Sequence, residues 1–267
     1  MKRIIILLTA AMMFASCGEN FNAAYLLSSG AKIAQAATLT DEQIQAYVTQ
    51  YVQQLDAQSP VLPETNAYVK RMRNLTKGIT EADGIPLNFK VYKTDDVNAF
   101  ACADGSVRIY SGLMDRMTDD EVLGVIGHEI GHVALRHSKK QFKAALRNSA
   151  IRDAVVSTGG AIAVLTASQL GDIGEALLSA KFSRKQEEQA DDYGYDFLVA
   201  HNKNPWAMAM SFEKLLNLSN GGASAGTQAA SSSAASEIFS DHPATESRIA
   251  KMSARATNDG YKRPTKK

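Results

Sequence analysis

Two histidines and one glutamate stand at a spacing that can hold a metal ion. The segment His128-Glu129-Ile130-Gly131-His132 places the histidines four residues apart. On an α-helix such positions lie on one face, about 40° from each other, so both imidazoles can bind one ion, and Zn²⁺ accepts such nitrogen ligands. Glu129 then flanks the ion, where it can take a proton from a water molecule that the metal activates. The segment predicts zinc-dependent hydrolysis.

A hydrolytic zinc site needs a third protein ligand and an open position for water. No further histidine follows at the short spacing that metzincins use. A better candidate lies in residues 183–191, Ser-Arg-Lys-Gln-Glu-Glu-Gln-Ala-Asp, where Ser183 can cap a helix on which Glu187 and Asp191 share one face. Spacing alone leaves open whether Glu187 binds metal or is an ordinary solvated glutamate.

The helix that carries the two histidines has its own start signal. Thr118 and Glu121 have capping-box spacing ahead of an apolar periodic segment, which predicts a helix over residues 119–138. Gly127 and Gly131 lie within this helix although glycine lowers helix stability. Their presence fits a crowded site, where a larger side chain would not have room.

Strand signals precede this helix. Residues 87–92 alternate with a period of two, as a half-buried strand does. Segments 98–102 and 106–110 flank Asp104-Gly105, which predicts a hairpin with a two-residue turn. Helical spacing covers the other long segments, which are 19–58, 64–77 and a tract over 140–200 broken by Gly159-Gly160, Gly171 and Gly174.

Three separated motifs together resemble a known family. They are the HEIGH segment at 128–132, the Ser-Arg-x-x-Glu-x-x-Ala-Asp segment at 183–191, and His242-Pro243 followed by Arg248. This set resembles the zinc peptidases of the CAAX prenyl protease and HtpX type, above all their periplasmic lipoprotein branch, over about residues 26–248. The resemblance implies a mainly α (α+β) fold: a helical, gluzincin-like zincin domain with a small β-sheet beside the HEIGH helix. Matching stretches also occur at 96–101 and 110–114.

The same resemblance assigns roles to individual residues. It implies one Zn²⁺ per chain held by His128, His132 and Glu187, with Glu187 rather than Glu188 as third ligand. Asp191 is then the carboxylate that orients His132 or His128.

The C-terminal motif and one strand also receive roles from the resemblance. His242 either occupies the open metal position in a resting state or hydrogen-bonds the reaction's oxyanion, with Arg248 in support; the alternative is a surface histidine at a helix start. Residues Asn98, Ala99, Phe100 and Ala101 resemble an edge strand that pairs with an extended substrate. They can equally be a sheet packed on the zinc helix, and both can be true.

The N-terminal sequence is typical of a targeting segment. Lys2 and Arg3 precede an apolar run, Ile4 to Phe14, which spans about 16 Å as a helix and is too short to cross a bilayer. Ala15-Ser16 before Cys17 resembles a lipobox, which predicts a signal peptide over 1–16 and a lipid on Cys17. The alternative is an ordinary cleavable signal. Gly18 after the cysteine favours, by resemblance, the periplasmic face of a Gram-negative outer membrane.

Composition sets further limits. With 29 basic and 28 acidic residues the formal charge is +1, which argues against a nucleic-acid binder that relies on a basic surface. Two cysteines exclude a disulfide scaffold. If Cys17 is lipidated, we expect Cys102 to be buried and inert. We interpret His137 and His201 as structural residues.

The expected organisation has four parts. They are a signal peptide (1–16), a lipidated helical segment (17–58), a zinc peptidase domain (59–252) with a mobile loop at 219–236, and a basic, frayed tail (253–267). Within the domain, residues 152–178 are interpreted as a lid, a patch that dips into a membrane or contacts a partner, or a core helical hairpin.

Three functions follow, in order of preference. The first is a zinc endopeptidase that degrades misfolded or unassembled cell-envelope proteins. The second is an outer-membrane protein assembly factor or chaperone with a latent zinc site, in contact with the assembly machinery. The third is a zinc hydrolase acting on peptidoglycan or another non-protein bond.

Overall fold

The computed structural model describes residues 40–148, 164–178, 181–220 and 242–265. The signal peptide, Cys17, Gly159-Gly160 and the loop from residue 221 to 236 lie outside the described residues.

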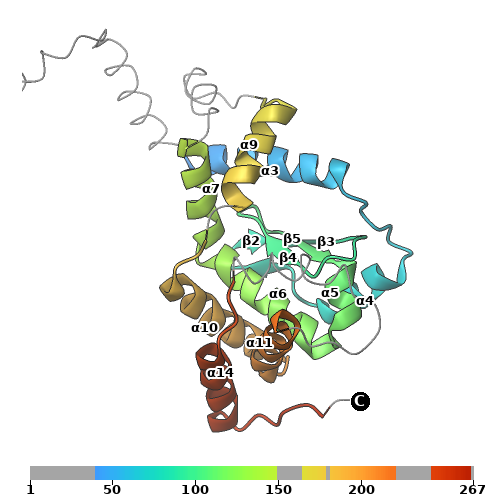
Figure 1. The fold of residues 1–267 in the computed structure, drawn as a ribbon, viewed down its shortest axis with the longest axis vertical. Coiled ribbons are helices and arrows are strands. Elements are labelled where there is room, and N and C mark those ends of the chain that lie inside the picture. The colour runs from blue at the N-terminus through green and yellow to red at the C-terminus, as the bar shows by residue number, and fades with distance from the viewer. Residues whose placement is uncertain (1–39, 149–163, 179–180, 221–241, 266–267) are drawn as a thin grey trace, which may run out of the picture.

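Helices dominate the described chain, and a small sheet lies beside the HEIGH helix, which confirms the expected fold class (Figure 1). The helices are α3 (Asp41–Gln58), α4 (Ala67–Leu75), α5 (Ser111–Arg116), α6 (Asp119–Ala134), α7 (His137–Asn148), α9 (Ala167–Leu178), α10 (Arg184–Ala200), α11 (Trp206–Ser219) and α14 (Glu246–Asn258). The strands are β1 (Glu81–Ala82), β2 (Ile85–Pro86), β3 (Asn88–Tyr92), β4 (Ala99–Ala101) and β5 (Ser106–Tyr110).

The main sheet is mixed and has β5 in its centre. On one side β3 runs parallel to β5, and on the other side β4 runs antiparallel to it, with Ala99 opposite Ile109. No strand of the described chain pairs with the outer edge of β4. That edge therefore keeps backbone groups that can pair with another extended chain.

The β4–β5 hairpin differs from the expected two-residue turn. Its ends are joined by residues 103–105: the Cys102 N–H donates to the Ser106 carbonyl, and the Gly105 N–H donates to the Cys102 carbonyl at 3.0 Å. Gly105 has φ +85°, a left-handed conformation that favours glycine. The extra residue is accommodated as a bulge after the turn.

Helix α6 begins as expected and ends early. Thr118 accepts a hydrogen bond from the Glu121 N–H, and the Glu121 carboxylate accepts one from the Thr118 N–H, which confirms the capping box. The helix ends at Ala134 rather than 138 because Arg136 adopts φ +60°. A new helix, α7, then begins at His137.

The prediction that Gly171 and Gly174 break the helical tract is wrong, because helix α9 runs through both residues. A Cβ atom at Gly174 would lie 3.4 Å from the Tyr51 ring of α3, which is ordinary van der Waals contact. Leu170 and Ile173 of α9 are buried, so the described part of residues 152–178 packs in a core.

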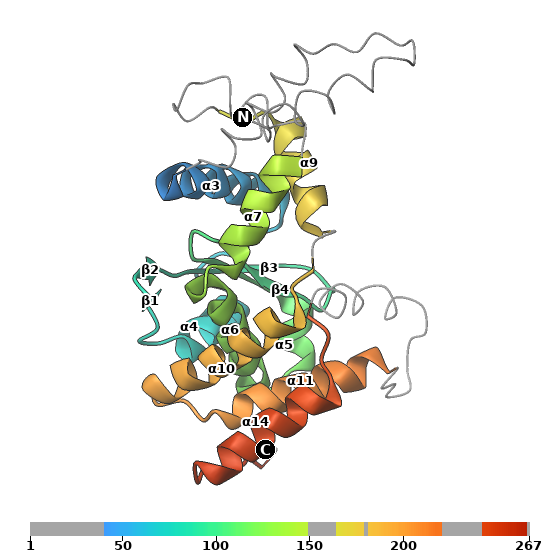
Figure 2. The same ribbon diagram turned by 90° about the vertical axis from the view of Figure 1, so that its left-hand side faces the viewer.

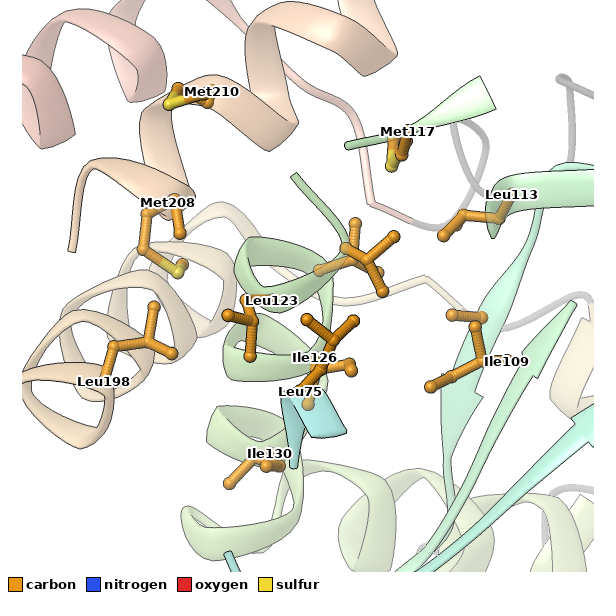
Figure 3. Packing of buried hydrophobic residues seen from close by; sticks show 14 of the residues in the cluster. Leu75, Ile109, Leu113, Met117, Leu123, Ile126, Ile130, Leu198, Met208 and Met210 are labelled. Carbon is orange, nitrogen blue, oxygen red and sulfur yellow. The ribbon is translucent and has the colours of Figure 1, made fainter. Parts of the chain in front are cut away.

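The main core lies on both sides of α6 (Figure 3). Ile126 lies on the side of Ile109 from β5, whereas Leu123 lies on the side of Leu198 from α10 and Met208 from α11. Burial of each such aliphatic side chain stabilises the folded state by roughly 1.5–3 kcal/mol. This packing fixes α6, and with it the HEIGH segment, between the sheet and two helices.

A second core joins α3, α7 and α9 at one end of the molecule, while α14 lies at the other end (Figures 1 and 2). Its buried side chains are Ile44, Tyr47, Val48, Val52, Phe142, Leu146, Leu165, Leu170 and Ile173. Helix α3 is therefore packed against the rest of the chain through α7 and α9.

Asp56 of α3 is the polar link between this second core and the sheet. It accepts hydrogen bonds from Arg108 of β5 at 2.8 and 3.0 Å, from Lys90 at 2.8 Å and from the Tyr92 hydroxyl at 2.6 Å. The Arg108 side chain is only 2% exposed. Burial raises the pKa of Asp56, but these hydrogen bonds outweigh it and lower the pKa to about 2.

We expect Asp56→Ala to lower the free energy of unfolding by about 3 kcal/mol, because it leaves the Arg108 guanidinium buried without its charged partner. The wild-type advantage is full above about pH 4 and is lost as the pH falls towards the folded-state pKa of about 2, since protonation removes the carboxylate charge. Denaturant unfolding across this range measures both effects. Gln53→Ala, on the exposed face of the same helix, is the control, and an Asp56→Ala midpoint equal to the wild type at pH 7 would contradict the prediction.

The described part of the C-terminal tail, up to residue 265, differs from the expected frayed tail. Helix α14 continues to Asn258, and residues 261–262 contact the start of α11 and the residues before it. The Trp206 indole N–H donates to the Tyr261 carbonyl at 2.9 Å, and Arg263 pairs with Glu213. None of the described helices combines the length and the apolar character needed to cross a membrane.

Candidate metal centre

Helices α6 and α10 approach each other closely at glycines. A Cβ atom at Gly131 would lie 2.5 Å from the Ala190 carbonyl oxygen, and one at Gly194 would lie 2.7 Å from the Gly127 carbonyl oxygen. Glycine at these positions therefore lets the two backbones touch. The contact brings α10, which Ser183 caps as expected, alongside the HEIGH segment.

Four side chains converge where these helices meet. His128 Nε2 lies 3.1 Å from His132 Nε2 and 3.1 Å from His242 Nδ1. Glu187 Oε1 lies 3.1 Å from His242 Nδ1 and 3.3 Å from His132 Nε2. One ligand atom from each of the four residues falls within 4.8 Å of all the others. The structure thus brings together residues from three separated motifs.

The donor set fits a metal ion. Atoms held about 2.0–2.1 Å from a common tetrahedral centre are about 3.3–3.4 Å apart. The four donor–donor distances given above, 3.1 to 3.3 Å, are close to this value. Three ring nitrogens at such distances repel unless protons or a cation lie between them. The buried Glu129 Oε1 also accepts no hydrogen bond from the described residues. A buried carboxylate oxygen of this kind is costly without a cation nearby.

Asp191 and Arg248 support the cluster from behind. His128 Nδ1 lies 2.8 Å from Asp191 Oδ1, so of the two candidate histidines it is His128 that Asp191 contacts. Arg248 donates to both Asp191 oxygens, at 2.8 and 2.6 Å, and to the Pro243 carbonyl at 2.8 Å. Its Nη1 also lies 2.9 Å from Glu187 Oε2 as an ion pair. Arg248 is buried and does not line the cavity described below, so it holds other groups in place.

The surroundings of His132 were not predicted from the sequence. The Phe182 ring stacks on the His132 ring, with centroids 3.9 Å apart. His132 Nδ1 lies 3.2 Å from Nδ1 of His137, which is buried as well. No local pattern marks Phe182, because its importance depends on its position just before the capped helix α10.

Charge and burial set the protonation states of the site. Burial raises the pKa of Glu187, but hydrogen bonds from His132 and His242 outweigh it, so the pKa lies well below its ordinary value. Burial lowers the pKa of His132 well below its ordinary value. Burial also lowers the pKa of His242, but the Glu129 and Glu187 carboxylates outweigh it and raise the net value. Burial raises the pKa of Glu129, and the nearby His242 lowers it by a smaller amount, so the net pKa is raised.

A cavity of about 330 Å³ opens beside the cluster. Glu129 and His242 face it, and residues 98–103 of β4 and its hairpin form one wall. Tyr110 of β5, Phe182 and three helices of the second core form the rest of the lining, with Tyr51 and Leu55 from α3, Ser138, Gln141 and Phe142 from α7, and Leu177 from α9. A mostly apolar cleft with a few convergent polar groups is typical of a substrate site.

The remaining candidate residues occupy distinct places. Glu188 is exposed and does not belong to the donor cluster, in contrast to the buried Glu187. Cys102 is half-buried and lines the cavity, and burial raises the pKa of its thiol. His201 contacts the Phe197 carbonyl at 2.8 Å, within its own helix end. Cys17 lies outside the described residues.

The site combines a histidine pair on one helix with a buried glutamate from a second helix. A further carboxylate faces a cavity beside an open strand edge. This arrangement is that of a metalloendopeptidase of the helical zincin class. The chain belongs to peptidase family M48, whose family model matches residues 63–256. This confirms the resemblance seen in the three sequence motifs.

Relatives of the chain are metalloproteases by name. It is 41% identical to Metalloprotease LoiP of Escherichia coli K12 over 98% of this chain and 99% of that protein. It is also 41% identical to Metalloprotease YcaL of the same organism, over 82% of this chain and 88% of that protein. A third relative, the beta-barrel assembly-enhancing protease of E. coli K12, is 30% identical over 77% of this chain but only 42% of its own length.

Proposed function

We propose that this protein is a zinc-dependent endopeptidase whose single Zn²⁺ is held by His128, His132 and Glu187. The observation that carries the proposal is the donor cluster itself, since one ligand atom from each of four residues lies within 4.8 Å of the others, beside a cavity that Glu129 faces. Zinc bound there supplies Lewis-acid activation of water and of the scissile carbonyl.

Residues of the chain carry out the proton transfer and the positioning of the ligands. Glu129, buried and with an oxygen free of hydrogen bonds from the described residues, accepts the proton of the attacking water and delivers it to the departing amine. Asp191 and Arg248 keep the ligands in orientation.

The open edge of β4 is the proposed substrate-binding strand. Asn98, Ala99, Phe100 and Ala101 line the cavity, and β4 also packs on α6. An extended peptide that adds to this edge would place its backbone beside Glu129 through main-chain hydrogen bonds. Such pairing gives affinity with little dependence on the substrate sequence.

His242 is proposed to fill the fourth metal position in a resting state, because its Nδ1 lies among the other donors. We therefore expect His242→Ala to weaken zinc binding and to raise the rate of peptide hydrolysis. A fall in rate of about 10²-fold would instead assign His242 as the oxyanion donor. Zinc titration and kcat/KM measure the two effects, and the absence of change in both would contradict either role.

We propose misfolded or unassembled cell-envelope proteins as substrates and a lipid on Cys17 as the anchor, at the periplasmic face of the outer membrane. The lipobox-like segment before Cys17 supports the anchor, and the name of the beta-barrel assembly-enhancing relative supports the setting. Metabolic labelling with a fatty-acid probe tests the lipid: a labelled wild type and an unlabelled Cys17→Ala variant are expected.

The test of the activity is zinc content together with casein cleavage by the purified chain. One zinc per chain, cleavage that stops on chelation and cleavage that returns with added zinc would establish the peptidase. A chain that binds no zinc would refute the metal site. Zinc without cleavage would support the second candidate, an assembly factor whose site His242 keeps closed. Full rescue of a deletion strain by Glu129→Gln would also favour that second candidate.

A further inference from the structure

Two histidines of the chain that do not belong to the donor cluster differ in what they contact. His201 satisfies its Nδ1 with a backbone carbonyl of its own helix end, which is what a purely structural histidine does. His137 instead directs Nδ1 at the Nδ1 of His132, 3.2 Å away. His132 and His137 are 1% and 2% exposed, so bulk water does not reach this contact.

The backbone is bent so that this contact can form. On a continuous helix, residues five apart lie about 140° from each other and face nearly opposite sides. The chain leaves the helix at Arg136, which adopts φ +60°, and α7 then starts with His137 turned back onto His132. A left-handed conformation costs a non-glycine residue about 1 kcal/mol or more. The fold sustains this cost at the junction where the two rings meet.

The proton positions follow from the geometry. His132 turns Nε2 toward Glu187 and His128, so Nε2 must present a lone pair if a metal binds there. A neutral imidazole then carries its proton on Nδ1. Two nitrogens 3.2 Å apart form a hydrogen bond only if one of them is an acceptor, so the His132 Nδ1–H donates to His137 Nδ1. The proton of His137 then resides on Nε2.

We propose that His137 is a positioning residue that fixes the tautomer and the ring orientation of the metal ligand His132. The two histidine ligands thus have different supports: a carboxylate, Asp191, for His128 and a neutral imidazole for His132. Partners of this kind affect metal affinity about 10–100-fold. The inference rests on the proposed metal site and adds to it a residue outside the donor cluster.

Three variants of the full-length chain test this role by zinc affinity, measured in competition with a chromophoric chelator. His137→Phe keeps the ring but has no acceptor, and we expect its zinc dissociation constant to rise 10–100-fold. His137→Asn places an oxygen near the position of Nδ1 and is expected to stay within about threefold of the wild type. His201→Phe, the matched control, is expected to bind zinc as the wild type does.

Equal zinc affinity of His137→Phe and the wild type would overturn the inference, and so would equal weakness of the Phe and Asn variants, which would indicate packing alone. Nitrogen-15 NMR of the zinc-loaded wild type provides a test without any variant. The expected protonated atoms are Nδ1 of His132 and Nε2 of His137, and a proton on Nδ1 of His137 would refute the role. If the wild type itself binds no zinc, the proposed metal site fails. If the wild type binds zinc and His137→Phe binds it equally tightly, the metal site stands and this inference fails.

Discussion

Glu129→Gln is expected to reduce kcat/KM for peptide hydrolysis by about 10³-fold while the protein keeps its bound zinc. The reason is geometric, because Glu129 faces the cavity and is not one of the four residues of the donor cluster. Glutamine has nearly the same shape but cannot accept a proton at the same atom. Burial also raises the pKa of Glu129, which makes its carboxylate a better proton acceptor.

Glu188→Gln is the matched control, since the same change is made at an exposed residue next to the proposed ligand Glu187. It should alter neither turnover nor zinc content. The experiment compares initial rates on a fluorogenic casein at equal zinc loading. Loss of zinc from Glu129→Gln would mean that Glu129 binds the metal, and a rate within tenfold of the wild type would exclude it as the proton acceptor.

The parts of this site that are governed by local rules could be predicted from the sequence. The capping boxes at Thr118 and Ser183 are satisfied within three residues, so they are readable without the fold. The spacing of His128 and His132 likewise depends only on helix geometry. The capped helix predicted that Glu187 and Asp191 share a face, but the choice of Glu187 as a ligand needed the family resemblance.

The parts that depend on long-range packing could not be predicted. Arg108 lies in an ordinary-looking strand, and only the structure shows that it is buried because Asp56 of α3 reaches it. His137 was placed on a continuous helix, where it would face away from His132; a single left-handed residue reverses that arrangement. A backbone break without glycine or proline leaves no clear signal in the sequence.

Asp191→Ala is expected to affect both stability and metal binding. The Asp191 side chain is completely buried and serves Arg248 and His128 at once. Its removal leaves the Arg248 guanidinium buried with one carboxylate fewer, and we expect the free energy of unfolding to fall by about 3–5 kcal/mol. The zinc dissociation constant should rise about 10–100-fold, because His128 loses the acceptor that orients its ring.

Denaturant unfolding of the metal-free protein and zinc competition measure these two effects separately. Asp192→Ala is the control at the adjacent position, where the side chain is 45% exposed and pairs with Lys251. An exposed pair of this kind contributes about 0–1 kcal/mol, and its loss should not affect zinc binding. Wild-type zinc affinity in Asp191→Ala would contradict the orienting role.

The double variant Asp191→Ala/Arg248→Met then separates the two roles of one carboxylate. Methionine removes the buried charge that Asp191 had compensated and fills a similar volume against Phe212, over whose ring the Arg248 guanidinium lies at 4.3 Å. Stability should recover in part, whereas zinc affinity should stay weak because His128 still has no acceptor on Nδ1. Recovery of both stability and zinc affinity would show that Asp191 acts on the metal only through the packing of Arg248. Recovery of stability alone would show that the same buried carboxylate holds the fold together and orients a ligand by two separable interactions.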